Sequence, residues 1–199
     1  MINKSDSKQN YVMRIPNDLK PMDMLLFRGE GLVSELIMFG HKKNTAFSHV
    51  GVVYDSNIIF HSTTLMGNIP DFISGSPFSG VQLNDLRETI KRYNGEVFVR
   101  RAIVQLEDRT KFQAQVERFY GTPYEENYGD LVGAEIDTIF DDHSVDFSSV
   151  FCSELVAELA NKVMSAYLEY PPDEYTPTDC SRAWIGQYGS DIEKIKWKV

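Results

Sequence analysis

Residues 151–160 read FCSELVAELA, and their pattern predicts a helix that begins at or just before Cys152. Leu155, Val156 and Leu159 recur at helical spacing, and Cys152 lies three and four residues before the first two. The cysteine side chain therefore falls on the same inward-facing stripe. Unpaired backbone N–H groups at a helix start favour a thiolate and stabilise a nearby oxyanion, so the position suits a nucleophile. Taken alone, the stretch is more typical of a buried structural cysteine.

The overall composition predicts a single globular domain and disfavours two classes of partner. The chain has 199 residues, of which 42% are hydrophobic and 25% charged, and these values are ordinary for one domain. Its 20 Lys and Arg residues against 29 Asp and Glu residues leave a net charge of −9, which disfavours binding to nucleic acid phosphates. Because no run of about 18 apolar residues is present, we expect no membrane span.

The N-terminus and the cysteines lead to three further expectations. Residues 1–17 are polar, which predicts a flexible arm before a single domain over residues 18–199. The arm lacks the apolar stretch of a secretory signal, so we expect a cytoplasmic location, with a viral or host-cell setting left open. The sequence contains two cysteines, Cys152 and Cys180, which excludes a disulfide framework. We interpret Cys180 as structural.

Some segments of the chain have the apolar pattern of strands, and others have the pattern of helices. The expected strands cover residues 22–27, 48–55, 57–62, 80–86, 97–104 and 192–199, the last of them at a sheet edge. The expected helices cover residues 32–39, about 84–93 with Asn84 as a cap candidate, 110–120, and the stretch from residue 152. We expect a loop over residues 64–80, anchored by apolar side chains such as Phe72 and Ile73, and a stiff extended segment over residues 170–177.

The two runs SHVGVVYD (48–55) and NIIFHS (57–62) predict a hairpin with turn-forming residues between them. If Asp55-Ser56-Asn57 is the loop, Gly51 lies opposite His61, and His49 and His61 share one face as diagonal neighbours. Backbone positions in such a pair are roughly 7–8 Å apart, close enough for two imidazoles to meet. A two-residue loop would instead turn His61 to the other face.

Several of these segments, in this order, resemble the permuted papain-like amidases of the NlpC/P60 superfamily, in their YaeF/YiiX-like branch. The matching segments are SHVGVV, a polar residue twelve positions later, GTPY after a helix, FCSELVAE and TPTD, over roughly residues 20–180. Lecithin:retinol acyltransferases and a poxvirus protein group are more distant relatives. The resemblance implies a circularly permuted papain-like α+β fold, with an antiparallel sheet packed against helices and the catalytic cysteine at a helix N-terminus.

Carried over position by position, the resemblance assigns Cys152 as the nucleophile, His49 as the base and His61 as the group that orients the base. The YaeF/YiiX-like branch usually has glutamate at the third position, whereas this chain has histidine, as the acyltransferase branch does. Either residue accepts a hydrogen bond from the second ring nitrogen of the base. FCSEL lacks the Asn-Cys-Glu-His pattern of the acyltransferases, and Cys180 stands where the permuted amidases commonly have phenylalanine.

The implied activity is hydrolysis of an amide bond, in a peptide or isopeptide, through an acyl-enzyme and without a cofactor or metal. A histidine partner and a helix N-terminus are expected to lower the pKa of the Cys152 thiol, and its backbone N–H is the first candidate oxyanion donor. Three alternatives stay open: a lipid acyltransferase or thioesterase of the same superfamily, a catalytically silent binding module, and a zinc site at His49, His61 and Cys152. We expect a peptide-like or acyl substrate, and the sequence does not indicate the oligomeric state.

Overall fold

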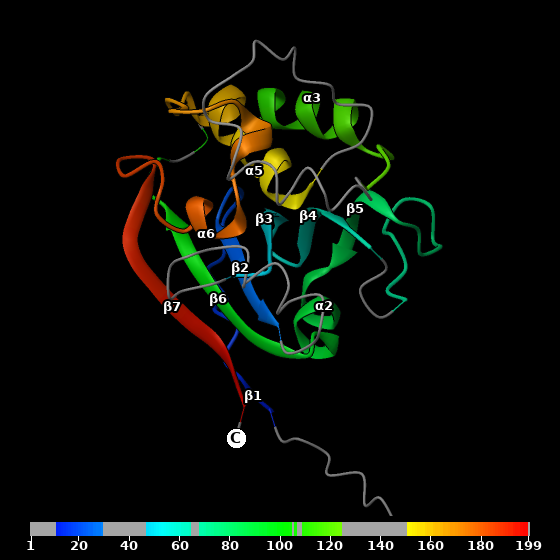
Figure 1. Ribbon diagram of the computed structural model, residues 1–199. Helices are drawn as coiled ribbons and strands as arrows, with labels where there is room; N and C mark the ends of the chain where they lie inside the picture. The colour runs from blue at the N-terminus through cyan, green and yellow to red at the C-terminus, as the bar shows by residue number, and fades with distance from the viewer. Residues whose placement is uncertain are drawn as a thin grey trace, which may run out of the picture.

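Seven strands form one antiparallel sheet in the part of the chain that the structure describes (Figure 1). The structure, a computed structural model, describes residues 11–29, 47–64, 68–104, 106, 109–124 and 151–198. The strands lie in the order β1-β7-β6-β2-β3-β4-β5. In chain order the elements are β1 (Tyr11–Met13), β2 (Met24–Gly29), β3 (His49–Asp55), β4 (Ile58–Thr63), β5 (Gly80–Asp85), α2 (Leu86–Arg92), β6 (Gly95–Ala102), α3 (Thr110–Phe119), α5 (Cys152–Met164), the 3-10 turn η1 (Pro172–Glu174), α6 (Pro177–Cys180) and β7 (Tyr188–Lys198). The predicted α+β class and the antiparallel sheet packed against helices are confirmed.

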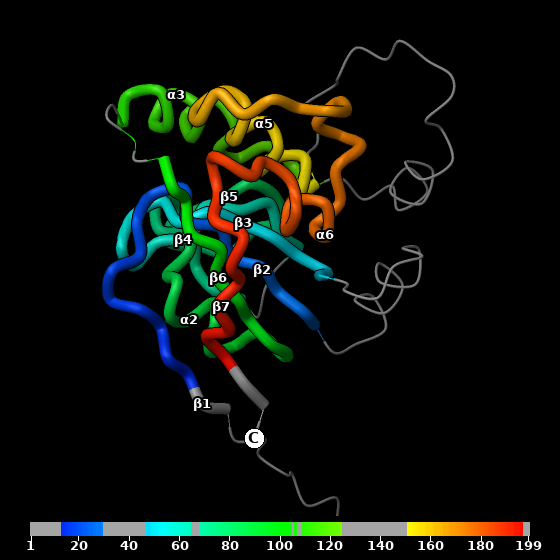
Figure 2. The backbone as a smooth tube through the Cα atoms, turned by 90° about the vertical axis from the view of Figure 1, so that its left-hand side faces the viewer, coloured from blue at the N-terminus to red at the C-terminus, as the bar shows by residue number. Residues whose placement is uncertain are grey.

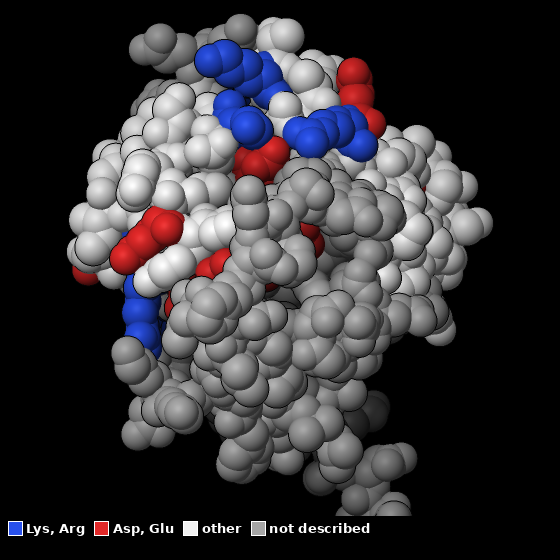
Figure 3. Space-filling model, turned by 45° about the horizontal axis from the view of Figure 1, so that its top comes forward, with Lys and Arg blue, Asp and Glu red and all other residues white. Residues whose placement is uncertain are grey.

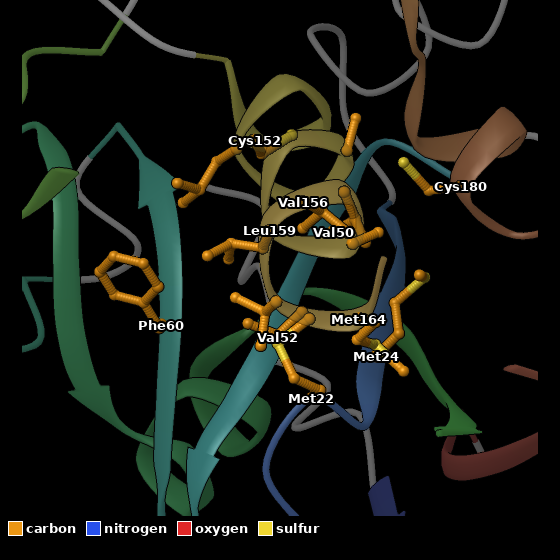
Figure 4. Close-up of a cluster of buried hydrophobic side chains, with 14 of the residues drawn as sticks. Met22, Met24, Val50, Val52, Phe60, Cys152, Val156, Leu159, Met164 and Cys180 are labelled. Carbon is orange, nitrogen blue, oxygen red and sulfur yellow. The ribbon is translucent and has the colours of Figure 1, made fainter. Parts of the chain in front are cut away.

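Side chains of β3 alternate between two cores that lie on opposite faces of the sheet. Val50 and Val52 belong to the core that α5 covers, and Val53 belongs to a second core against α2. Figure 4 shows Val156 and Leu159 of α5 beside Val50 and Val52. Fully burying a side chain of this size stabilises the fold by about 1.5–3 kcal/mol, so the predicted helical stripe holds α5 on the sheet. None of the helices in the described ranges is long and apolar enough to cross a bilayer.

The hairpin of β3 and β4 has the predicted register but a different turn. Val53 lies opposite Ile59 as expected, whereas Asp55 pairs with Ile58, so the loop has two residues instead of three. Tyr54 is the additional residue on β3, and the register shifts at this point. A bulge of one residue reverses the face change that a two-residue loop causes. The side chains of β4, including His61, therefore lie on the faces of the sheet that the three-residue loop predicted.

The two chain ends meet at one side of the sheet, where the structure differs from the expectations for both. Tyr11–Met13 pairs with Lys196–Lys198, so the expected arm over residues 1–17 contributes strand β1 and residues 1–10 lie outside the described part. Figure 2 shows β1 beside the end of β7. The end of the last strand, over Lys196–Lys198, is consequently not at the sheet edge, because its outer backbone groups pair with a short strand from the N-terminal region.

The segment over residues 170–177 forms short helical turns instead of the stiff extended structure that its prolines suggested. Thr176 accepts a hydrogen bond from the backbone N–H of Asp179 at 3.1 Å, and Pro177 occupies the first helical position. A capping side chain and a proline at this position both favour a helix start. Cys180 thus ends a helix of four residues, α6. The helix expected over residues 32–39 lies outside the described residues.

A buried carboxylate anchors the described part of the loop before β5. The expected anchors Phe72 and Ile73 are 68% and 61% exposed, whereas Asp71 is 1% exposed. The Asp71 carboxylate accepts hydrogen bonds from backbone N–H groups, including that of Leu83 at 2.9 Å, and from the hydroxyl of Tyr120 at 2.6 Å. This residue therefore ties the loop to β5 and to the end of α3.

Candidate active site

Cys152 is the first residue of α5, as predicted, and its side chain is 4% exposed. The backbone N–H of Phe151, just before the helix, donates to the Glu154 carboxylate at 3.2 Å. This bond satisfies the N–H of the residue that precedes the helix. The ring of Tyr124 packs edge-on against Phe151, with centroids 5.8 Å apart. The helix start is therefore held in place by side chains on both sides of the cysteine.

The environment of the Cys152 thiol opposes ionisation. Burial raises its pKa to about 11, while the backbone N–H groups of Val50, Ser153 and Cys152 itself act in the opposite direction. The lowered pKa expected from the sequence is wrong for this conformation, because removing the thiolate from water outweighs the neighbouring N–H dipoles. No hydrogen bond joins the sulfur to His49 or His61 within the described residues, so the expected contact between thiol and base is not formed.

The position of the thiol follows from the hydrogen-bond pattern of β3. Successive N–H groups of an antiparallel strand point alternately to its two neighbours. The N–H of Val53 donates at 2.8 Å to the carbonyl of Asp23, on the β2 side, so the N–H of Val50 points toward β4. The described pairing of β3 with β4 ends at Val52 and Phe60, which leaves this N–H for the sulfur. The thiol therefore lies where the two strands separate.

His49 and His61 meet directly, as the hairpin register predicts. Nε2 of His49 lies 2.9 Å from Nδ1 of His61, and both side chains are buried. Gly51 makes this approach possible, because a Cβ at that position would lie 2.8 Å from Cβ of His61. The two imidazoles come from β3 and β4, the strands whose separation accommodates the thiol.

Asn84 continues the chain of hydrogen bonds beyond the histidines. Its Oδ1 lies 2.7 Å from Nε2 of His61. Its Nδ2 lies within donating distance of the Pro70 carbonyl at 3.1 Å, the Ile69 carbonyl at 3.3 Å and Gln82 Oε1 at 3.1 Å. Because the two carbonyls only accept, they orient the amide, and Oδ1 faces His61 as an acceptor.

The orientation of this amide determines the tautomer of both histidines. Since Asn84 Oδ1 accepts, Nε2 of His61 carries a hydrogen and its Nδ1 is the acceptor. His49 must then donate from Nε2, and its own Nδ1 carries a lone pair. Nδ1 of His49 has no hydrogen-bond partner in the described structure, and it is not among the unpaired side-chain atoms sealed from solvent. The network therefore presents a proton acceptor on His49.

Burial keeps both imidazoles neutral at pH 7. It lowers the pKa of His61 to about 4, against the opposing effect of the bond to Asn84. Burial, and then the proximity of His61, hold the pKa of His49 well below its ordinary value. A neutral imidazole is the form that can accept a proton, so His49 keeps an unprotonated ring nitrogen through the neutral range.

Sequence reasoning assigned Asn84 the wrong role. Strand β5 runs to Asp85, and that residue caps α2 by accepting the N–H of Glu88 at 2.8 Å. Gln82 lies opposite His61 across β4 and β5, which makes Asn84 a neighbour on the same face. The signal in the sequence was the alternation of polar residues at 82 and 84 in VQLND, which is typical of a strand.

The arrangement of the histidines differs from that of a zinc site. Within the described ranges, no group of three or more His, Cys, Asp or Glu side chains is placed to hold a metal ion. The facing nitrogens of His49 and His61 are 2.9 Å apart, closer than the roughly 3.3 Å that follows for two ligands 2.0–2.1 Å from a tetrahedral zinc. Nε2 of His49 and Nδ1 of His61 are bonded to each other, so these two facing nitrogens are not placed to share a metal ion.

The comparisons with known proteins find a similarity among solved structures but none among family models or curated proteins. Among solved structures, the chain is similar to the crystal structure of the metalloprotein yiiX from Escherichia coli O157:H7, with a TM-score of 0.49 and 17% sequence identity. The similarity covers 74% of this chain and 67% of that one. We therefore infer the function from the side-chain geometry.

Proposed function

We propose that the protein is a thiol hydrolase of the permuted papain-like type, with Cys152 as the nucleophile and His49 as the general base. His61 and Asn84 are positioning residues that act through His49. One observation carries the proposal: the bonds from Asn84 to His61 and from His61 to His49 leave Nδ1 of His49 unprotonated, at the strand opening that holds the thiol. Catalytic triads for covalent acyl transfer combine a nucleophile, a base that takes its proton and a third group that orients the base.

In the first step, Sγ of Cys152 attacks the substrate carbonyl carbon, and the thiol proton moves to Nδ1 of His49. Because burial holds the thiol pKa at about 11, the proton leaves as the S–C bond forms and not beforehand. The His49 imidazolium is stabilised by its Nε2–H bond to Nδ1 of His61. The step requires contact between the thiol and His49, and such catalytic bonds often form only when substrate binds.

The carbonyl oxygen becomes an oxyanion, for which the backbone N–H of Cys152 at the start of α5 is the proposed donor. One such donor typically contributes about 10²–10³ in rate. The C–N bond of the substrate then breaks, and Nδ1–H of His49 gives its proton to the leaving nitrogen. Water next gives a proton to Nδ1 and attacks the thioester, and the departing sulfur regains the proton. The products are a free amine and a carboxylic acid, and the enzyme returns to its initial state.

Trapping the acyl-enzyme tests the proposed function. We expect incubation with p-nitrophenyl acetate to place one acetyl group on Cys152, detected by peptide mass spectrometry, and we expect a panel of fluorogenic peptide and isopeptide amides to be cleaved. Acetylation restricted to other residues would contradict the proposal. Transfer from phospholipids without amide cleavage would favour the acyltransferase alternative. Stoichiometric zinc in the purified protein, with no acylation, would favour the metal site, and the absence of both would favour a silent module.

Replacing Asn84 with alanine should lower kcat by about tenfold or more, with little change in KM. Without the Oδ1 acceptor, His61 can donate from Nδ1, and His49 then carries its proton toward the thiol, where it cannot act as a base. Gln82→Ala is the matched control, because the Gln82 side chain bonds to Asn84 and to the Phe78 carbonyl but, among the described residues, to neither imidazole, and the variant should retain most of the activity. Asn84→Asp keeps the acceptor and adds a charge that raises the pKa of His61, so it should recover activity relative to alanine and move the acid limb of the pH profile upward. Equal losses in the alanine variants of Asn84 and Gln82, with unchanged pH profiles, would indicate a purely structural role.

A further inference from the structure

A cavity of about 480 Å³ lies on the α6 side of the sheet, apart from the candidate active site. Its volume falls in the range of small-molecule sites. Phe47, Phe98 and Ile192 provide apolar walls, and Arg28, Arg100 and Arg182 provide the charged ones. None of Cys152, His49, His61 or Asn84 lines it. The cavity thus combines an apolar interior with three arginines in a chain whose net charge is −9.

Arg100 is the central feature of this cavity because it is a cation 1% exposed to solvent without a carboxylate partner among the described residues. Its Nε donates to the Gly189 carbonyl at 2.7 Å, and its Nη1 donates to the carbonyls of Cys180 at 2.9 Å and Ala183 at 2.7 Å. Buried charges are normally paired with an opposite charge, because neutral acceptors offset only part of the lost hydration. A missing anion is therefore the feature to be explained.

The second amino group of Arg100 is free to bind such an anion. A guanidinium has five N–H donors, and Nη2 carries two of them without a partner in the described structure. The unpaired side-chain N and O atoms that are fully sealed from solvent belong to Ser153, Trp184 and Tyr188, so Nη2 is not sealed. Arg100 lines the cavity, and Nη2 carries the donors of its guanidinium that have no partner among the described residues.

Arg28 adds a second guanidinium at the same cavity. Its terminal carbon lies 5.4 Å from the ring centre of Phe47 and 5.0 Å from that of Phe98, so two aromatic faces hold it. Nη1 of Arg28 and Nζ of Lys194 both bind the carboxylate of Glu96. Two cations share this one anion, and Arg100 adds a further positive charge. The region therefore has a local excess of positive charge, whereas on the face in Figure 3 basic side chains lie beside acidic ones.

We propose that this cavity binds a small molecule with an apolar body and one oxyanion head, a carboxylate or a phosphate. The head binds Nη2 of Arg100 and the guanidinium of Arg28, which match the geometry of a planar or tetrahedral oxyanion. The apolar body packs against Phe47, Phe98 and Ile192. The proposal does not depend on the proposed hydrolase, because none of the residues that line the cavity takes part in that chemistry.

Calorimetry on the full-length protein with four probes tests the proposal: octanoate, octyl phosphate, octanol and inorganic phosphate, each below any micelle concentration. We expect at least one of the two anionic amphiphiles to bind at least about tenfold more tightly than octanol, and to weaken as salt is raised. Their relative affinity identifies the preferred head. Inorganic phosphate alone should bind more weakly than octyl phosphate. Equal binding of octanol and both amphiphiles, or of the two phosphates, would overturn the proposal.

Variants locate the binding. Arg28→Gln, at a partly exposed side chain, should weaken binding of the better probe by about tenfold. Arg87→Gln removes the same charge from exposed Arg87 on α2, against the other core, and should leave the affinity unchanged. Because Arg100 also ties α6 to the sheet, its role is followed without mutation, by shifts of the arginine Nε–H signals in an NMR titration of the wild-type protein. Shifts that spare Arg100, or equal effects of the two variants, would contradict the site.

Discussion

Replacing Cys152 with alanine is expected to lower kcat/KM for amide and ester substrates by at least about 10³-fold. The variant lacks the atom that forms the covalent bond to the acyl group, and what remains is binding and the oxyanion donor at the start of α5. Initial rates with p-nitrophenyl acetate and with the best amide of the panel measure the loss. A thermal melt should show a small change only, because the substitution removes one sulfur atom from the edge of a core.

Cys180→Ala is the matched control for this experiment. Cys180 is fully buried, its Sγ lies 3.8 Å from the carbonyl of Ser153, and burial raises the pKa of its thiol well above the ordinary value. It is therefore expected to be inert, and its loss should change kcat/KM by no more than a few-fold. If Cys152→Ala retains activity, or if both variants lose it equally, Cys152 is not the nucleophile.

Replacing His49 with glutamine should lower kcat by about 10²–10⁴, the usual contribution of a general base. The variant should also change the pH profile. In the wild type, the base must be neutral to act and its pKa lies well below the ordinary value, so activity should persist below pH 6.5 and fall only as the pH drops through that lowered pKa. Without the base, the rate should follow the thiolate fraction and rise with pH toward the Cys152 pKa of about 11.

A pH titration of kcat/KM on both proteins measures this change, with thermal melts to confirm folding. Phe27 packs against the His49 ring with centroids 5.1 Å apart, so a planar glutamine amide preserves more of this contact than alanine does. An unchanged profile in His49→Gln would show that another group removes the thiol proton.

The parts of the site that follow from local sequence patterns could be predicted. The stripe of α5 with Cys152 in its first turn depends only on helical spacing, and the shared face of His49 and His61 depends on a hairpin within a few residues. The turn was harder, because a bulge at Tyr54 replaces the third loop residue and gives the same register. A three-residue loop and a two-residue loop with a bulge place His61 on the same face, so the residue types in the turn do not distinguish them.

The remaining features depend on contacts between distant segments. Asn84 contacts His61 because β5 pairs with β4 across an intervening loop, and this pairing is not visible in the local pattern. The raised pKa of the Cys152 thiol reflects how completely the surrounding core excludes water. Arg100 and Arg101 are adjacent in the sequence, but alternation along β6 separates their side chains. Arg100 lines the cavity, whereas Arg101 binds the buried carboxylate of Asp23 at 2.9 Å.

The three-residue strand β1 has a consequence for self-association. Strand β7 is eleven residues long, and an uncovered strand of this length is a template onto which a second copy of the chain can add a strand. β1 covers the outer edge of β7 over Lys196–Lys198. The preceding part of β7 carries Asp191, Glu193 and Lys194, whose charges disfavour pairing with a second copy. A few backbone hydrogen bonds from the N-terminal region thus help to keep this sheet from growing into an aggregate.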